Sequence, residues 1–129
     1  MRYLILVIAL LSTLSAIDWP DNYEEALVEA KKEKKDIYLF IGSEDCKFCE
    51  KLKKEVLSKK EVVDTLKKDY VLIYLSTVID DIPSQFEVSP IPRHYFLTDT
   101  GSVIYTTIGG RSKEGFYELL DDVKEIKEE

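Results

Sequence analysis

The segment Cys46–Cys49, with the sequence Cys-Lys-Phe-Cys, is the feature that most constrains the fold of this chain. It follows an apolar, strand-like run at 36–41 and begins a helix-like run that extends to about Ser58. Two cysteines at this spacing can close a small, reversible disulfide. The unpaired N–H groups and positive dipole end of a helix also favour a thiolate on the first cysteine. The pattern therefore predicts a redox site.

Two other interpretations of the cysteine pair remain open. A structural disulfide is disfavoured because so short a loop restricts the unfolded chain little. A metal-handling module that uses the Cys46 and Cys49 pair as soft ligands for copper or zinc is the main alternative. A site that adds His94, the only histidine, as a third ligand is possible in composition. No fourth ligand is evident, so we expect no bound metal, and a core role for His94 is preferred.

Residues 1–16 have the pattern of a secretory signal peptide. Arg2 supplies the positive start, an apolar run spans 3–11, and small residues up to Ala16 offer a cleavage site. An uncleaved anchor is the alternative, although the run is shorter than the roughly 20 residues of a membrane span. We expect a periplasmic or secreted protein whose mature domain is 17–129, membrane-bound only if the signal is retained.

Length and charge limit the possible functions. The chain has 129 residues, which fits one domain, and a formal net charge of −7. An acidic chain has no general attraction to phosphates, so a nucleic-acid partner is not expected. Export to an oxidising compartment makes a disulfide chemically reasonable.

Hydrophobic periodicity predicts an α/β domain with a central mixed sheet and helices on both faces. Asp45 is the expected N-cap of the helix that carries the cysteines. The expected elements are helices at 22–35, 46–58, 61–68 and from about 113 onward, a helical turn at 82–86, and strands at 36–41, 70–76, 93–98 and 102–108.

This order of elements, with Cys-x-x-Cys after the first strand, resembles the thioredoxin fold over about 18–127, a three-layer fold. Two further features carry the resemblance: Ile91-Pro92 ahead of the 93–98 strand, and the Gly109-Gly110 pair before the last helix. In thioredoxin-like proteins a proline at this place follows a cis peptide bond and lies beside the cysteines. The resemblance therefore implies that the Ile91–Pro92 bond is cis.

The resemblance also implies a mechanism. Cys46 would be the nucleophile and Cys49 the resolving thiol. Pro92, which has no N–H, and the backbone of Ile91 would position an extended substrate segment. The expected partners are client proteins with cysteines or disulfides and a separate redox protein that supplies or accepts electrons. No Gly-rich dinucleotide motif is present, so no cofactor is expected, and the protein is expected to be a monomer.

The sequence departs from thioredoxin at three places. Lys47-Phe48 replaces Gly-Pro, Asp45 replaces the tryptophan before the first cysteine, and Phe40 stands where thioredoxin has a buried acid. The helix terminus and Lys47 should stabilise a Cys46 thiolate, whereas Glu44 and Asp45 should oppose it. We therefore expect a modest lowering of the Cys46 pKa.

The balance between the groups that stabilise the Cys46 thiolate and those that oppose it favours a reductase or an isomerase-like protein over a strong oxidase. A non-catalytic thioredoxin-like binding module, with incidental cysteines, is a further alternative.

Arg93 could orient an acidic substrate, but a surface salt bridge is the preferred interpretation of this residue.

Overall fold

A computed structural model describes residue 17 and residues 19–129; the signal-peptide prediction therefore lies outside the described residues. Four strands form one mixed sheet in the order β2-β1-β3-β4, with β1 and β2 parallel and the other two pairs antiparallel. The elements are α1 (Tyr23–Glu33), β1 (Asp36–Gly42), α2 (Lys47–Leu52), η1 (Lys53–Leu57), α3 (Lys60–Asp69), β2 (Tyr70–Ser76), β3 (Arg93–Leu97), β4 (Val103–Ile108) and α4 (Lys113–Lys127).

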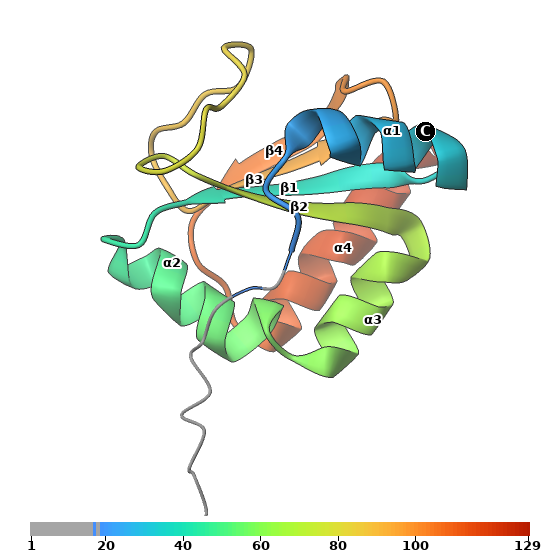
Figure 1. The fold of residues 1–129 in the computed structure, drawn as a ribbon. Helices are drawn as coiled ribbons and strands as arrows, with labels where there is room; N and C mark the ends of the chain where they lie inside the picture. Colours follow the sequence, from blue (N-terminus) through green and yellow to red (C-terminus); the bar gives the residue numbers. More distant parts are fainter. Residues whose placement is uncertain (1–16, 18) are drawn as a thin grey trace, which may run out of the picture.

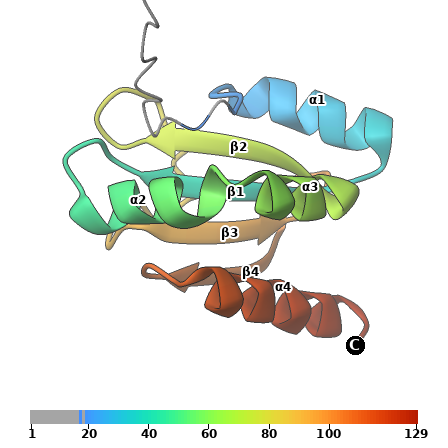
Figure 2. The same ribbon diagram turned by 90° about the horizontal axis from the view of Figure 1, so that it is seen from below.

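The sheet is the middle of three layers, with α1 on one face and α2, α3 and α4 on the other (Figures 1 and 2). Strand β1 explains this arrangement, because successive side chains of a strand point to opposite faces. Its Ile37, Leu39 and Ile41 pack with α1 residues, whereas Tyr38 and Phe40 pack with the helices of the other face. The predicted three-layer α/β fold is confirmed.

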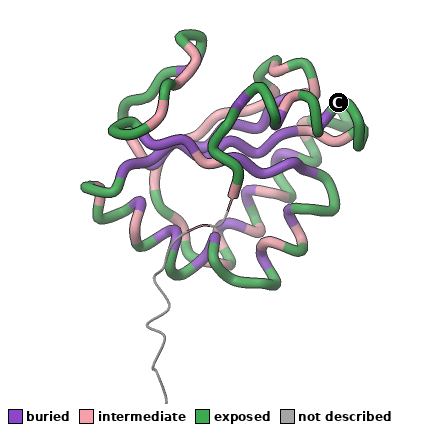
Figure 3. Tube along the Cα trace, viewed as in Figure 1, coloured by how far each residue is buried: buried purple, intermediate pink, exposed green. Residues whose placement is uncertain are grey.

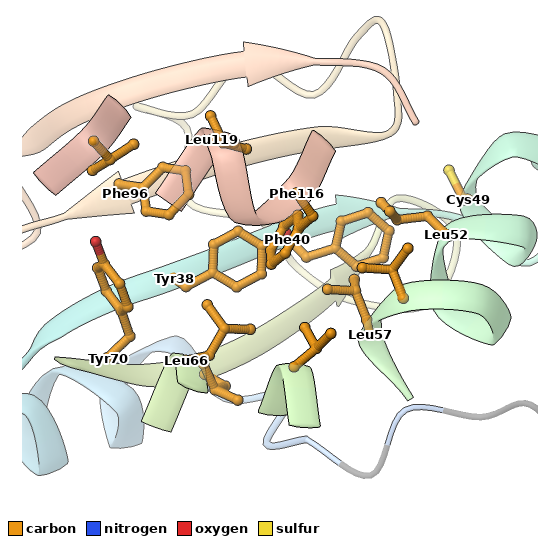
Figure 4. Packing of buried hydrophobic residues seen from close by; sticks show 14 residues of the cluster. Tyr38, Phe40, Cys49, Leu52, Leu57, Leu66, Tyr70, Phe96, Phe116 and Leu119 are labelled. Atoms are coloured by element: carbon orange, nitrogen blue, oxygen red, sulfur yellow. The ribbon is translucent and has the colours of Figure 1, made fainter. Parts of the chain in front are cut away.

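The core lies on both faces of β1 and extends along the sheet, where the buried segments concentrate (Figure 3). The side of α2, α3 and α4 holds the larger aromatic cluster, in which Tyr38, Phe96 and Phe116 are buried (Figure 4). Burial on both faces requires the nearly continuous apolar sequence of β1. The same register pairs Ile41 with Arg93, which brings the start of β3 to the end of β1 that leads into the cysteine segment.

The prediction that Asp45 caps the cysteine helix was wrong. Cys46 is the N-cap: its backbone is extended (φ −97°, ψ 112°), and its Sγ accepts a hydrogen bond from the Cys49 N–H at 3.2 Å. A cap side chain must reach the N–H three residues ahead, and from this extended position the cysteine sulfur does so.

One other boundary differs from the sequence prediction. The α-helical part of the predicted 46–58 helix ends at Leu52, and the segment continues as the π-helical turn η1. The helical turn predicted at 82–86 is a single hydrogen-bonded turn, in which the Phe86 N–H donates to the Pro83 C=O. Across the part of the chain that the structure describes, no helix has the length and apolar character needed to cross a bilayer.

Candidate redox site

Cys46 and Cys49 form a disulfide at the start of α2, with their Cα atoms 5.2 Å apart. Cys49 is fully buried and belongs to the aromatic side of the core, whereas Cys46 is partly exposed. Figure 4 shows the Cys49 sulfur at the edge of this cluster, on the first turn of the helix. One cysteine is therefore partly exposed to solvent, and the other is held against the core.

The loop before the helix is held tightly to the end of β1. Cys46 N–H donates to Ser43 C=O at 3.3 Å, and Asp45 N–H donates to Ser43 Oγ at 3.2 Å. A Cβ atom at Gly42 would lie 3.0 Å from the Phe40 ring and 3.2 Å from the Cys49 sulfur. Glycine at position 42 thus lets Cys49 approach the strand closely.

Pro92 lies at the same end of the sheet as the cysteine loop. The Ile91–Pro92 peptide bond is cis, and Pro92 directly precedes Arg93, the register partner of Ile41. Pro92 C=O accepts a hydrogen bond from Gly109 N–H at 2.8 Å, so the loop after β4 is fixed to it. Ile91 is half-buried and contacts the hydrophobic clusters on both faces of the sheet. The Ser89–Pro90 bond is also cis, which the sequence did not suggest.

His94 is a buried structural residue in this arrangement. Its Nδ1 lies 2.7 Å from the Tyr38 hydroxyl and its Nε2 lies 2.9 Å from the Gly109 carbonyl oxygen. A neutral ring satisfies both contacts when Tyr38 donates to Nδ1 and Nε2–H donates to Gly109. Desolvation by burial lowers the pKa of His94 from 6.5 to about 4, against the hydrogen bond to Gly109. The imidazole is therefore neutral at physiological pH.

The geometry does not support a metal site that includes His94 as a third ligand. Both ring nitrogens of His94 already have protein partners. Within residues 17 and 19–129, no group of three or more His, Cys, Asp or Glu side chains is arranged to hold a metal ion. A Cys46–Cys49–His94 site would require His94 to leave two hydrogen bonds in the core.

Protonation of His94 should destabilise the fold in acid. Between pH 6.5 and about 4 the unfolded chain binds a proton at this residue while the folded protein does not. The free energy of unfolding should therefore fall by about 2–3 kcal/mol across this window. Denaturant titrations at pH 7, 5.5 and 4 should show that the stability advantage of wild type over His94→Gln shrinks as pH falls. An advantage that stays constant with pH would contradict this assignment.

The residues predicted to tune the thiol lie in different settings. Lys47 and Asp45 are exposed. Glu44 turns toward β2: its two carboxylate oxygens accept hydrogen bonds from Tyr74 Oη at 3.1 Å and from Ser76 Oγ at 2.7 Å. Burial alone would raise the pKa of Glu44, but these hydrogen bonds hold it below its ordinary value.

Lys53, a residue not predicted to belong to the site, has a side chain that is only 7% exposed. Its Nζ donates to Tyr74 Oη at 2.8 Å and to Glu50 Oε1 at 3.0 Å. Desolvation would lower the pKa of Lys53, but the hydrogen bonds to Tyr74 and Glu50 outweigh it and raise the pKa above its ordinary value. The available signal was its position: Lys53 follows Cys49 by four residues and lies on the helix face that is otherwise apolar.

Arg93 makes a salt bridge, as preferred from the sequence, but the expectation that it lies at the surface was wrong. Its side chain is 8% exposed, and one guanidinium nitrogen lies 3.2 Å from a carboxylate oxygen of the exposed Glu87. A second contact runs to Ser89 C=O at 3.4 Å. The arginine thus fixes the segment before Pro92 to β3.

Comparisons with known proteins agree with this architecture. The profile of the thioredoxin-like domain family matches residues 23–124. Anterior gradient protein 3 from Mus musculus is 29% identical over 101 residues, which are 78% of this chain and 61% of that protein. The chain thus spans about three fifths of the length of that relative. An uncharacterized protein from Archaeoglobus fulgidus is 21% identical over 87 residues, covering 67% of this chain and 68% of its own length.

Solved structures show the same fold at low sequence identity. A thioredoxin from Thermus thermophilus superposes with a TM-score of 0.67 at 24% identity, covering 80% of this chain and 84% of its own. A DsbH oxidoreductase superposes with a TM-score of 0.66 at 19% sequence identity, covering 83% of each chain. A disulphide isomerase from Xylella fastidiosa Temecula1 superposes with a TM-score of 0.63 at 21% sequence identity, covering 84% of this chain and 99% of its own. Because the family profile extends from the first helix into the last, the chain belongs to the thioredoxin-like domain family.

Proposed function

We propose that this protein is an exported thiol–disulfide oxidoreductase that exchanges the Cys46–Cys49 pair with cysteines of client proteins. The observation that carries the proposal is the disulfide at the start of α2, with one partly exposed and one buried cysteine. The helix N-terminus favours negative charge on Cys46, its N-cap. The oxidoreductase and isomerase names of structural neighbours with this fold support the same chemistry.

In the reductive direction, the Cys46 thiolate attacks a client disulfide, forms a mixed disulfide and releases one client thiolate. Cys49, deprotonated in its turn, attacks the Cys46 sulfur and releases the second client thiolate. The products are a reduced client and the oxidised Cys46–Cys49 pair, which a separate redox protein reduces again. The oxidative direction runs the same steps in reverse.

Ile91 and Pro92 are proposed to position the client segment. Pro92 cannot donate a hydrogen bond, and Ile91 precedes β3 and lies outside its paired residues. An extended client segment beside Ile91 would find backbone groups for strand-like pairing, with its cysteine next to Cys46. Arg93 and Gly109 hold this edge in place through their contacts with Ser89 and Pro92.

The charges at the site favour a reductase or isomerase over a strong oxidase. Lys47 and the helix terminus stabilise the thiolate, and the carboxylates of Glu44 and Asp45 oppose it. Such a balance stabilises the reduced pair only moderately, whereas a strong oxidase depends on strong stabilisation of its reduced form. The protein is proposed to act as a monomer, after removal of residues 1–16 in the periplasm or outside the cell.

A trapping experiment tests the proposal. Reduced Cys49→Ala protein should accumulate a one-to-one mixed disulfide through Cys46 with a peptide that contains an intramolecular disulfide, because no resolving thiol remains. Mass spectrometry after acid quenching measures the adduct. Wild type should release the reduced peptide, and Cys46→Ala should trap far less because its remaining thiol is buried. The absence of any adduct with Cys49→Ala would leave a non-catalytic binding module as the better description.

A further inference from the structure

The buried Lys53 side chain connects the helix of the cysteines to the neighbouring strand. Its ammonium group lies between Glu50 on α2 and Tyr74 on β2, with the bonds of 3.0 and 2.8 Å described above. The same nitrogen lies 4.1 Å from the centre of the Tyr74 ring, and this ring stacks on Phe40 with centroids 5.2 Å apart. A lysine is rarely buried in a protein core unless it is paired.

This connection continues to the segment that precedes the cysteines. Tyr74 Oη accepts from Lys53 and donates to Glu44, and Glu44 lies two residues before Cys46. Glu50 lies one helical turn after Cys46, where its N–H donates to Cys46 C=O at 3.0 Å. One buried cation therefore contacts one of the two carboxylates that flank the partly exposed cysteine directly, and is linked to the other through the Tyr74 hydroxyl.

We propose that Lys53 is a positioning residue for the thiol chemistry: it pairs directly with Glu50, reaches Glu44 through the Tyr74 hydroxyl, and so keeps the negative charge of both from suppressing the Cys46 thiolate. The proposal rests on the role of Cys46 as the attacking thiol. Phe40, an apolar residue, occupies the core beneath this network, so the charge compensation comes from the α2–β2 side of the site.

The other charged groups around the cysteine loop do not replace Lys53. On the loop itself, Asp45 and Lys47 are exposed and oppose each other in sign. From the turn after β2, the Asp80 carboxylate accepts from Ser76 N–H at 2.8 Å. From the β4–α4 loop, the Arg111 guanidinium is engaged with Gly109 C=O and Thr107 Oγ1. His94, on β3, is neutral at physiological pH.

The test measures how the rate of Cys46 alkylation by iodoacetamide depends on pH in the fully reduced protein, which requires no client. Lys53→Met should raise the pH midpoint by about half a unit or more, which corresponds to a roughly threefold lower thiolate fraction at a fixed pH. Glu50→Gln should shift the midpoint in the opposite direction. Lys53→Arg, which keeps the charge, should stay close to wild type.

The double variant Lys53→Met/Glu50→Gln separates charge compensation from a merely structural role. It has the same local charge as wild type, so its midpoint should return toward the wild-type value. A purely structural role predicts that the double variant is at least as impaired as Lys53→Met. Lys54→Met is the matched control, because it removes an exposed lysine one residue away. Equal shifts in Lys53→Met and Lys54→Met, or no recovery in the double variant, would overturn the proposal.

Thermal unfolding of each variant shows whether the substituted protein is still folded. If Lys53→Met does not fold, Glu50→Gln still tests the charge effect, because Glu50 is 42% exposed and a glutamine can still accept a hydrogen bond from Lys53. An unchanged midpoint in Glu50→Gln would then contradict the proposal. The alkylation result is also independent of the trapping experiment, so failure of one does not imply failure of the other.

Discussion

Replacing Cys46 with serine is expected to reduce dithiothreitol-driven reduction of insulin to the rate measured without the protein. Cys46 is the accessible member of the only cysteine pair, and a serine hydroxyl cannot form the mixed disulfide through which exchange proceeds. The remaining thiol, Cys49, is fully buried and cannot substitute for it. The turbidity of precipitating insulin chains measures the rate.

The fold should survive this substitution, which makes the loss of activity interpretable. A loop closed between residues three apart restricts the unfolded chain little, so removal of the disulfide should change stability only slightly. Circular dichroism and chemical unfolding of Cys46→Ser and of reduced wild type should therefore agree. Insulin reduction at equal rates by folded Cys46→Ser and wild type would exclude the proposed chemistry.

Truncation of Phe116 should produce the largest loss of stability among the α4 substitutions considered. This ring is fully buried and meets Tyr38 edge-on, with centroids 5.7 Å apart, and so joins α4 to the central strand. Removing a buried phenylalanine side chain costs about 3–5 kcal/mol, a large fraction of the roughly 5–15 kcal/mol that stabilises a typical domain. Guanidinium unfolding of Phe116→Ala at pH 7 measures the effect.

Two comparison variants show whether the effect comes from lost packing. Phe116→Leu keeps most of the buried volume and should cost less than about 1.5 kcal/mol. Glu118→Ala, at an exposed position of the same helix, should change stability by no more than about 0.5 kcal/mol. A Phe116→Ala protein as stable as Glu118→Ala would contradict the packing described for α4.

The architecture could be predicted because its signals are local. Strand β1 has an apolar sequence that only a doubly covered strand explains, and α4 has a serine cap and an apolar stripe at helical spacing. The helix from Cys46 was also placed correctly at its start. The N-cap of this helix was predicted wrongly. Aspartate is a common N-cap residue, which favoured Asp45, but the residue with the extended backbone of an N-cap is Cys46.

The candidate site was only partly predictable, because its remaining contacts join residues far apart in sequence. Glu44 meets Ser76 on β2, and Lys53 meets Tyr74 on the same strand. Lys53 lies four residues after Cys49 on an otherwise apolar helix face, but only its contact with Tyr74 on β2 shows that this lysine is buried and paired. The salt bridge of Arg93 was expected, but its burial depends on the segment 87–89, which has no regular pattern.

The reduction potential of the Cys46–Cys49 pair tests the central claim most directly. Equilibration of the protein in defined dithiol–disulfide buffers, followed by alkylation and mass spectrometry, measures the fraction reduced. A reversible redox pair with the proposed bias should titrate between about −270 and −180 mV, the range from thioredoxin to protein disulfide isomerase. A value below about −300 mV, as in structural disulfides of exported proteins, would contradict the account.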